Sequence, residues 1–409
     1  MKRSALLALG SALLMAVGAV PAQATAPAKD RGNVVGEWYD VTAQTVDAAG
    51  APTQITNSRT WAIGWIAAAR ATREAPHGPH RAAFQDAAVA SAVHDALAAL
   101  APTRKAELDA ALAATLRRVP DGSAERRGVA AGARQAKAVL ASRTGDGLDP
   151  ASVNAPFTVP AAAPGVWQPT PNGYAPAVQY GNRVAKPFLL DSPRQFRIGP
   201  PPALGSARYL ADLAEVRAYG AADSTVRTAR QTETATFWYG GSLALYTEPL
   251  RVALSRSRAS TAERAAFVGL FHAALVDTQI ATSDSKYTHL RWRPVTAIRT
   301  GNVAQDTTWS PLHNTPAHPD YPSGHGTYAG AAEVLLTSLA GARTAPYTLT
   351  SPTAPGVTRT YTGWQQLTRE NVDARVWSGI HSRTADEAGV RLGADVAGYA
   401  LRHAHRLFR

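Results

Sequence analysis

Cysteine is absent from all 409 residues of the chain. This absence excludes disulfide bonds, thiolate metal sites and cysteine nucleophiles together. The sequence also lacks the Gly-x-Ser-x-Gly pattern of serine hydrolases and the Gly-x-x-x-x-Gly-Lys loop of nucleotide-binding proteins. Stability must therefore come from burial, and any catalysis must use other residue types.

Blocks of like charge are missing as well, although the formal net charge is +12. Lysine and arginine are spread along the chain with acids among them, so the sequence does not indicate a nucleic-acid partner. The positive excess instead indicates a solvated basic surface, part of which could line a site for an anionic substrate or cofactor.

The first 24 residues have the pattern of a secretory signal peptide. Lys2 and Arg3 precede an apolar run over residues 4–20, and small residues around Ala24 form a cleavage site. A transmembrane anchor is the alternative, but the run is short and interrupted by glycine. No later stretch is expected to span a bilayer, so we expect a secreted, extracellular protein with no membrane anchor after cleavage.

The remaining sequence predicts an all-α fold of two packed helical bundles. Residues 25–145 and 206–409 are rich in apolar residues at helical spacing. Residues 146–205 contain too many prolines for a long helix but also many aromatics, which predicts an ordered segment wrapped across the helices. This segment is called the connector below.

Turn residues divide both halves into helices. In the first half we expect helices over 38–46, 60–72, 80–100, 103–118 and 124–142, with Trp61, Trp65 and Phe84 in the core. In the second half we expect helices over 211–219, 224–245, 247–255, 262–283, 286–299, 323–342, 363–377 and 382–408, with a short hairpin within 344–360.

The stretch His318 to Gly326, His-Pro-Asp-Tyr-Pro-Ser-Gly-His-Gly, is the first candidate site. Pro322 stops the preceding segment, Ser323 can cap the next helix, and Gly324 allows close approach to bare N–H groups. His325 stands at the edge of this predicted anion pocket.

Lys286 and Arg293 are seven residues apart, which places them two turns apart on one face of the expected helix over 286–299. With Trp292 beside them, two cations could hold an anion through an ammonium and a bidentate guanidinium. The alternative is a basic surface stripe that includes Arg291 and Arg299.

Arg375 and His381 complete the set of candidates. Ser378-Gly379 is expected to break the helix between them, so that both side chains converge from a helix end and the next helix start. The arginine would neutralise charge, and the imidazole would attack or coordinate a central atom. A helix-end arginine and a capping histidine are the alternative.

Taken in order, these three motifs resemble a known signature. Lys286-x6-Arg293-Pro294, Pro322-Ser323-Gly324-His325 and Arg375-x5-His381 are similar to the motifs shared by type 2 phosphatidic acid phosphatases (PAP2), bacterial class A acid phosphatases and vanadium-dependent haloperoxidases. The N-terminal helical half and the connector also resemble the secreted bacterial haloperoxidase-like group. The resemblance implies that residues 206–409 form the catalytic domain.

The resemblance also assigns roles to the motif residues. It implies that His381 is the axial residue, either bonded to the vanadium of vanadate or acting as the phosphohistidine nucleophile. His325 would be the general acid and base. The oxygens of vanadate or phosphate would be bound by Lys286, Arg293, Ser323, the Gly324 amide and Arg375.

One departure from the phosphatase pattern concerns the acid that orients the axial histidine. The phosphatases place aspartate four residues after it, where this chain has Ala385, and the nearest acid is Asp386. An orienting role for Asp386 is therefore doubtful, and a coordinating His381 is favoured over a phosphoryl-accepting one.

His318 resembles the histidine found at this place in the bromoperoxidase branch. It is a candidate pocket residue that tunes halide chemistry, with a structural hydrogen bond as the alternative. A competing interpretation takes His313, His318, Asp320 and His325 as zinc ligands, but the intervening prolines and the lack of an i, i+4 pair argue against it.

The favoured hypothesis is a vanadate-dependent haloperoxidase, which oxidises halide with hydrogen peroxide to a hypohalous equivalent that reacts with a small organic acceptor. The alternative in the same superfamily is a secreted phosphate monoesterase that acts through a phosphohistidine. A non-catalytic, oxyanion-binding helical protein is the alternative from another class. The halide, the organic acceptor and a homodimeric state are left open.

Overall fold

Residues 33–409 are described by the computed structural model, so the predicted signal peptide lies outside the described residues. Within this range helices predominate, and the one sheet is a two-stranded hairpin. The predicted all-α fold is confirmed.

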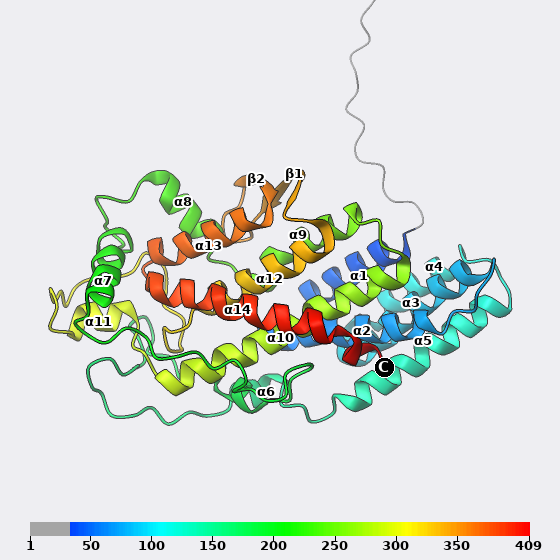
Figure 1. Cartoon of the computed structure of the whole chain (residues 1–409), viewed down its shortest axis with the longest axis horizontal. Helices are drawn as coiled ribbons and strands as arrows, with labels where there is room; N and C mark the ends of the chain where they lie inside the picture. Colours follow the sequence, from blue (N-terminus) through cyan, green and yellow to red (C-terminus); the bar gives the residue numbers. More distant parts are fainter. Residues whose placement is uncertain (1–32) are drawn as a thin grey trace, which may run out of the picture. The chain divides into compact units, whose positions relative to one another are not determined.

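The long helix α10 (Thr261–His289) packs against elements from both halves of the chain (Figure 1). A capping box between Ser260 and Glu263 defines its start, and it contacts α2, α12 and α14. Among the described helices, α10 is the one long and apolar enough to cross a membrane. By length and composition, the expectation that no stretch after the signal peptide could span a bilayer is therefore wrong. However, 83% of its apolar window is buried, which is typical of a core helix.

The first five helices lie close to their predicted positions, because the alanine-rich segments are bounded by strong turn residues. Trp61, Trp65 and Phe84 are buried, as predicted. Helices α3 and α5 pack closely at a glycine, where a larger side chain would not fit. A Cβ on Gly128 would lie 2.4 Å from the Phe84 carbonyl oxygen. The bounds are α1 (Val34–Ala49), α2 (Gln54–Arg73), α3 (Arg81–Leu100), α4 (Lys105–Leu116) and α5 (Ser123–Ser142).

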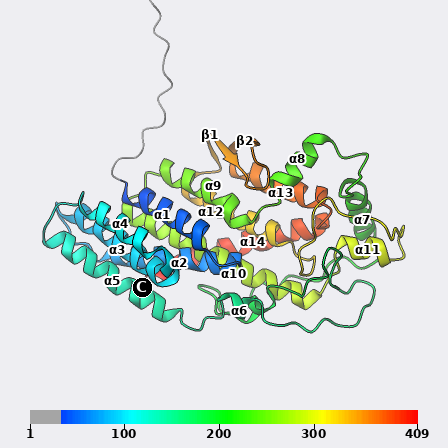
Figure 2. The ribbon, with the colours of Figure 1, turned by 180° about the vertical axis from the view of Figure 1, so that it is seen from behind.

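The connector is ordered by contacts with α10, seen from behind in Figure 2. It contains the short helices α6 (Pro150–Val153) and η2 (Tyr180–Val184) and no long helix, as its prolines predict. Trp167 is fully buried. The Asp277 carboxylate of α10 accepts hydrogen bonds from the amides of Phe188, Leu189 and Leu190 at 2.6–3.0 Å, which ties the connector to the core.

In the second half, two predicted helices are each divided in two. The expected helix over 224–245 is interrupted at Trp238–Gly241, where a glycine pair precedes α9 and Gly241 is extended. The expected helix over 286–299 is interrupted at Leu290–Arg293. The bounds are α7 (Ala207–Tyr219), α8 (Ala229–Phe237), α9 (Ser242–Arg256) and α11 (Pro294–Thr300).

Helices α12 (Gly324–Ala340) and α14 (Arg383–His403) approach each other closely through glycines. A Cβ on Gly330 would lie 2.1 Å from the Val390 carbonyl oxygen, and one on Gly393 would lie 1.9 Å from that of Thr327. The small residues of the two helices therefore bring the start of α12 against the start of α14.

The remaining elements are the predicted hairpin and α13. Strands β1 (Arg343–Thr350) and β2 (Thr358–Gly363) pair antiparallel, with Tyr347 opposite Tyr361. Helix α13 (Trp364–Trp377) follows directly. Residues 34–409 form one compact unit, and its largest hydrophobic cluster contains side chains from both helical halves. The predicted domain boundaries near 145 and 205 stay predictions.

Candidate active site

The start of α12 forms one wall of the site. Ser323 is the N-cap residue, and its hydroxyl accepts from the Gly326 amide at 3.3 Å. The Ser323 amide donates to the Ala385 carbonyl at 2.8 Å, which holds this turn against α14. A Cβ built on Gly324 would meet no atom within 4 Å, so open space lies beside this amide, as a bound ligand requires.

His325 lies half-buried on the same turn. Its Nε2 lies 2.9 Å from the Gly240 carbonyl oxygen, and because a carbonyl can only accept, Nε2 carries the proton. Burial, followed by the charge of Arg375, lowers the pKa of His325 to about 3. The ring is therefore neutral, and Nδ1 is the nitrogen that can take up a proton.

Lys286 and Arg293 meet in space, but not on one helix face as predicted. Lys286 lies in the last turn of α10, and Arg293 is the extended N-cap residue of α11. Arg293 is extended because a proline disfavours the helical conformation of the residue before it, and Pro294 itself suits the first position of a helix. Both are at most 1% exposed, which contradicts the alternative of a surface stripe.

Backbone carbonyls position both cations. Lys286 Nζ donates to the carbonyls of Pro319 and Asp320 at 2.6 and 3.2 Å. Arg293 donates through Nε to the His318 carbonyl at 2.7 Å and through one terminal nitrogen to that of Ile380 at 2.6 Å. The two cations therefore face the loop that precedes α12 and the loop that precedes α14.

Arg375 and His381 flank the predicted break. Helix α13 ends at Trp377, and Gly379 has a φ of +77° in a space where a Cβ would lie 2.4 Å from the Gly220 carbonyl oxygen. Arg375 and His381 are each 1% exposed. The predicted glycine-dependent break between the two helices is confirmed, whereas the assignment of both side chains to one functional site stays a prediction.

His381 is held by two neighbours. Its Nδ1 lies 2.6 Å from Asp320 Oδ1, and its Nε2 lies 3.1 Å from a terminal nitrogen of Arg293. Burial, followed by the charges of Arg293 and Lys286, lowers the pKa of His381 well below its ordinary value. The imidazole is therefore neutral.

Asp320 is a candidate site residue that the sequence analysis missed, since it was considered there only as a zinc ligand. It is 2% exposed, and its second carboxylate oxygen accepts from the Ser382 hydroxyl at 2.8 Å. Burial raises its pKa, while Arg293 and the Ser382 hydroxyl oppose that rise. Its place three residues before Ser323, inside the candidate stretch, was the available signal.

Asp386 does not orient His381. Its carboxylate is fully buried near the Ser323 hydroxyl, without a well-formed hydrogen bond to any residue of 33–409. Burial raises the pKa of Asp386 well above its ordinary value, and Ser323 and Arg375 oppose this rise. This placement agrees with the sequence analysis, which did not expect Asp386 to orient His381.

His318 contacts Arg293 directly. Its Nδ1 lies 3.0 Å from a terminal nitrogen of Arg293, which can only donate, so this histidine accepts a structural hydrogen bond. A role in tuning halide chemistry stays a prediction. His313 instead bonds the Ser378 hydroxyl at 3.0 Å and stacks on Tyr239. Within residues 33–409, no group of three or more His, Cys, Asp and Glu side chains could hold a metal ion.

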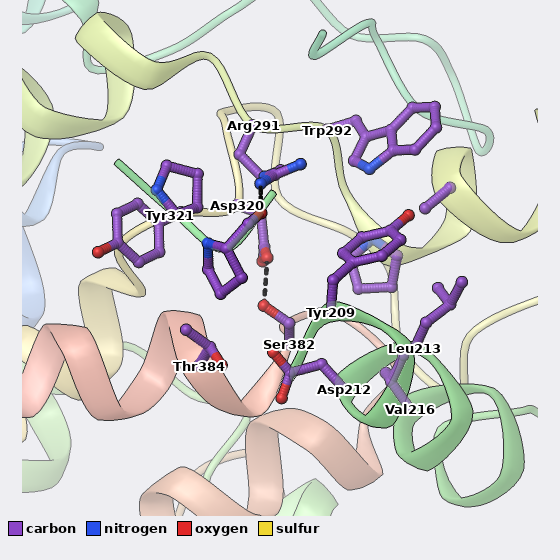
Figure 3. A pocket seen from close by; sticks show the side chains of 14 residues that line it. Tyr209, Asp212, Leu213, Val216, Arg291, Trp292, Asp320, Tyr321, Ser382 and Thr384 are labelled. Atoms are coloured by element: carbon purple, nitrogen blue, oxygen red, sulfur yellow. Dashed lines mark hydrogen bonds between the residues drawn. The ribbon is translucent and has the colours of Figure 1, made fainter. Parts of the chain in front are cut away.

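A small cavity of about 30 Å³ lies beside Asp320 (Figure 3). Trp292 and Tyr209 line it together with Asp320 and Ser382. Its volume would accommodate about two water molecules. Trp292, predicted to stand beside the bound anion, instead belongs to this cavity and to the hydrophobic cluster with α7.

The charges of the site favour an anion. Three buried cations face two buried carboxylates, and burial lowers the pKa of Arg293 and of Arg375 to about 10. Burial and the charge of Arg293 also lower the pKa of Lys286 well below its ordinary value. A bound anion would reverse these shifts, because it stabilises the charged forms.

Two observations test whether a tetrahedral oxyanion fits. The Nε of Arg375 is buried without a hydrogen-bond partner among residues 33–409, and the side chain's one bond, at 3.4 Å, goes to the Trp238 carbonyl. Open space lies beside Gly324. An unsatisfied cationic donor and a free helix start suit vanadate or phosphate oxygens.

Known proteins share this architecture. A solved structure of the first bacterial vanadium-dependent iodoperoxidase is 22% identical in sequence and has a TM-score of 0.73. The match covers 90% of this chain and 96% of the iodoperoxidase chain. Bacterial vanadium-dependent chloroperoxidase is 17% identical in its apo form, with a TM-score of 0.70 and coverage of 88% and 95%. Its holo form is also 17% identical, with a TM-score of 0.67 and coverage of 93% and 95%.

The sequence comparisons are narrower. A search of curated proteins finds no match. Residues 266–409 match the family model for the second helical-bundle domain of vanadium chloroperoxidase, and this segment contains all three motifs. The chain therefore has the fold of the vanadium haloperoxidases, and its residues 266–409 are similar to the second helical-bundle domain of that family model.

Proposed function

We propose that this protein is a vanadate-dependent haloperoxidase that oxidises halide with hydrogen peroxide to a hypohalous equivalent. The observation that supports this most strongly is the neutral His381, whose Nδ1 is bonded to Asp320 while Nε2 lies among the buried cations. A nitrogen lone pair beside fixed cations suits coordination of an oxyanion's central atom. Similarity to bacterial vanadium-dependent peroxidases gives further support.

In this proposal the chain's own residues divide the work. Lys286, Arg293 and Arg375 would hold the vanadate oxygens, with the Ser323 hydroxyl and the Gly324 amide. Vanadate, when bound, would supply the Lewis acidity that activates hydrogen peroxide toward halide. His325 holds one proton on Nε2 against Gly240, which leaves Nδ1 to take up a proton from the peroxide.

The second candidate is phosphate monoester hydrolysis through a phosphorylated His381. The contact between Asp320 and His381 favours it, because a carboxylate at Nδ1 makes Nε2 more nucleophilic. The same cations would stabilise the charge on the transferred phosphoryl group. The two activities therefore share one site and differ in the reaction at Nε2.

We also propose that the protein acts outside the cell, because residues 1–24 resemble a signal peptide. The partners would be hydrogen peroxide, a halide and a small organic acceptor. The structure describes neither residues 1–24 nor a partner.

A pair of assays tests the proposal. Halogenation of an activated cyclic dione is measured with vanadate, peroxide and iodide, bromide or chloride, beside hydrolysis of an aryl phosphate without vanadate. We expect peroxide-dependent halogenation with at least one halide. Phosphate hydrolysis inhibited by vanadate, with no halogenation under any halide, would replace the proposal by the second candidate.

A matched pair of arginine variants tests the site itself. Arg375→Ala should weaken vanadate binding by about 1.5–3 kcal/mol, because it removes a charged donor. Arg369→Ala, on the exposed face of the same helix, is the control and should bind vanadate like the wild type. Equal affinities for the two variants would remove Arg375 from the site.

A further inference from the structure

We infer that Asp320 is the positioning residue that selects the tautomer of His381 and thereby presents Nε2 to the central atom of the bound oxyanion. The inference rests on the proposed function, because it concerns the same site. It assigns to a loop before α12 the orienting role that the superfamily resemblance led us to seek after His381. Its basis is the placement of two neighbours with opposite hydrogen-bonding abilities.

The shorter contacts of His381 with its two neighbours favour the same tautomer. A carboxylate can only accept, so Asp320 Oδ1 at 2.6 Å requires the proton on Nδ1. A guanidinium can only donate, and one Arg293 nitrogen lies 3.1 Å from Nε2 and 3.4 Å from Nδ1, so the shorter contact favours a lone pair on Nε2. The Nδ1–H tautomer satisfies both contacts, whereas the other neutral tautomer would turn a lone pair toward the Asp320 carboxylate and keep only the longer contact with Arg293.

Three further contacts hold Asp320 in place. Its second oxygen accepts from Ser382, the residue after His381, at 2.8 Å. Its amide donates to the Arg291 carbonyl at 2.9 Å, and its carbonyl accepts from Lys286. Both backbone groups and one carboxylate oxygen are therefore committed before the bond to His381 is counted.

The cavity beside Asp320 makes Ser382 important for its orientation. Figure 3 shows the carboxylate between Arg291 and Ser382, with the cavity toward Tyr209 and Trp292. No packed side chain fills that space, so the Ser382 hydroxyl is the contact that stops the carboxylate from rotating away from His381. Ser382 thus positions Asp320, and Asp320 positions the axial nitrogen.

The inference predicts opposite responses of two oxyanions. Vanadate would form a bond with Nε2, whereas inorganic phosphate would be held at equilibrium by charge and hydrogen bonds alone. Asp320→Ala should lower vanadate affinity about 10–100-fold, as is typical when a partner of a ligating histidine is lost. Phosphate affinity should stay unchanged or rise, because the substitution removes a negative charge from the site.

The experiment measures both affinities by calorimetry in the wild type, Asp320→Ala, Asp320→Asn and Ser382→Ala. Nitrogen NMR of protein labelled in histidine reports the tautomer of His381 in each, assigned by comparison with His381→Ala. We expect Nδ1–H in the wild type and a mixture of tautomers in Asp320→Ala. Asp320→Asn should recover part of the vanadate affinity, because its amide oxygen can still accept from Nδ1. Ser382→Ala should give a smaller loss than Asp320→Ala.

Asp386→Asn is the control, because this equally buried acid does not contact His381 and should leave its tautomer unchanged. Vanadate and phosphate affinities that fall together in Asp320→Ala, or an unchanged tautomer with unchanged vanadate affinity, would overturn the inference. A wild type that binds phosphate but not vanadate would instead refute the proposed function, and the His381 tautomer in the variants would still decide the role of Asp320.

Discussion

Burial strongly shifts the pKa of single side chains in this protein, and His272 is the simplest example outside the candidate site. It is 1% exposed, stacks on Trp61 at 4.6 Å between ring centroids, and neither ring nitrogen has a hydrogen-bond partner within residues 33–409. Burial lowers its pKa to about 3. The folded protein therefore resists protonation of this ring, whereas the unfolded chain does not.

Replacing His272 should change how stability depends on pH. Because the folded pKa is depressed, the unfolded state binds the proton first, and stability falls as pH drops from about 6.5 toward 3 by up to about 1.4 kcal/mol per unit. His272→Phe keeps an aromatic ring and removes this contribution. We expect a shallower loss of unfolding free energy between neutral and acidic pH, measured by denaturant titration, than in the wild type.

The exposed His77→Phe is the control for His272→Phe and should leave that slope unchanged. The other buried histidines contribute to the acid sensitivity of all three proteins, so the comparison of slopes isolates His272. Identical slopes for His272→Phe and the wild type would show that the buried ring is not a source of acid sensitivity.

At the scale of elements, the contact between α12 and α14 positions the candidate anion site. Glycines let the two backbones touch, and this contact places Ser323 and Gly324 beside the loop that carries His381. Two neighbouring glycines on α12 have different surroundings. A Cβ on Gly326 would lie 2.6 Å from the Asp386 carbonyl oxygen, whereas one on Gly324 would enter open space.

Alanine at these two glycines should separate stability from binding. Gly326→Ala should destabilise the fold by about 1–3 kcal/mol, because the backbone of α14 must move. Gly324→Ala should keep or slightly raise stability, since alanine favours a helix, but its methyl group should weaken oxyanion binding. Thermal unfolding and vanadate titration measure the two effects. Strong vanadate binding by Gly324→Ala would show that the oxyanion lies elsewhere.

At the scale of the whole molecule, the connector is held to the central helix by buried polar groups. Asp277 accepts three connector amides, and Asp284 pairs with Arg197 at 2.7 Å. Both acids lie on α10, which also packs against α12 and α14. One helix therefore links the connector to the elements that carry the site.

Asp277→Ala should release the connector from the core. The substitution leaves three amides without acceptors, each worth about 1–3 kcal/mol when buried. We expect a lower unfolding temperature and faster proteolytic cleavage within residues 146–205, mapped by mass spectrometry. Asp191→Ala, which changes an exposed acid of the same connector, should be cleaved at the same rate as the wild type. Equal cleavage of both variants would show that other contacts hold the connector.

Much of the fold could be predicted because it depends on local pattern. Apolar spacing located the first five helices, and proline density located the connector. Two helix breaks were missed. The break before Pro294 follows from the effect of proline on Arg293, but the seven-residue spacing from Lys286 suggested a continuous helix. The break at Trp238–Gly241 depends on a glycine pair that a helix could have tolerated.

The sequence by itself determined the residue types of the site, the glycine break that joins Arg375 to His381, and the helix start at Ser323, because each depends on neighbours along the chain. Only the tertiary structure decided that Lys286 and Arg293 meet across a loop, that Asp320 and not Asp386 contacts His381, and that Arg375 retains an unpaired donor. These facts depend on residues distant in sequence, whose distances and hydrogen bonds exist only after packing.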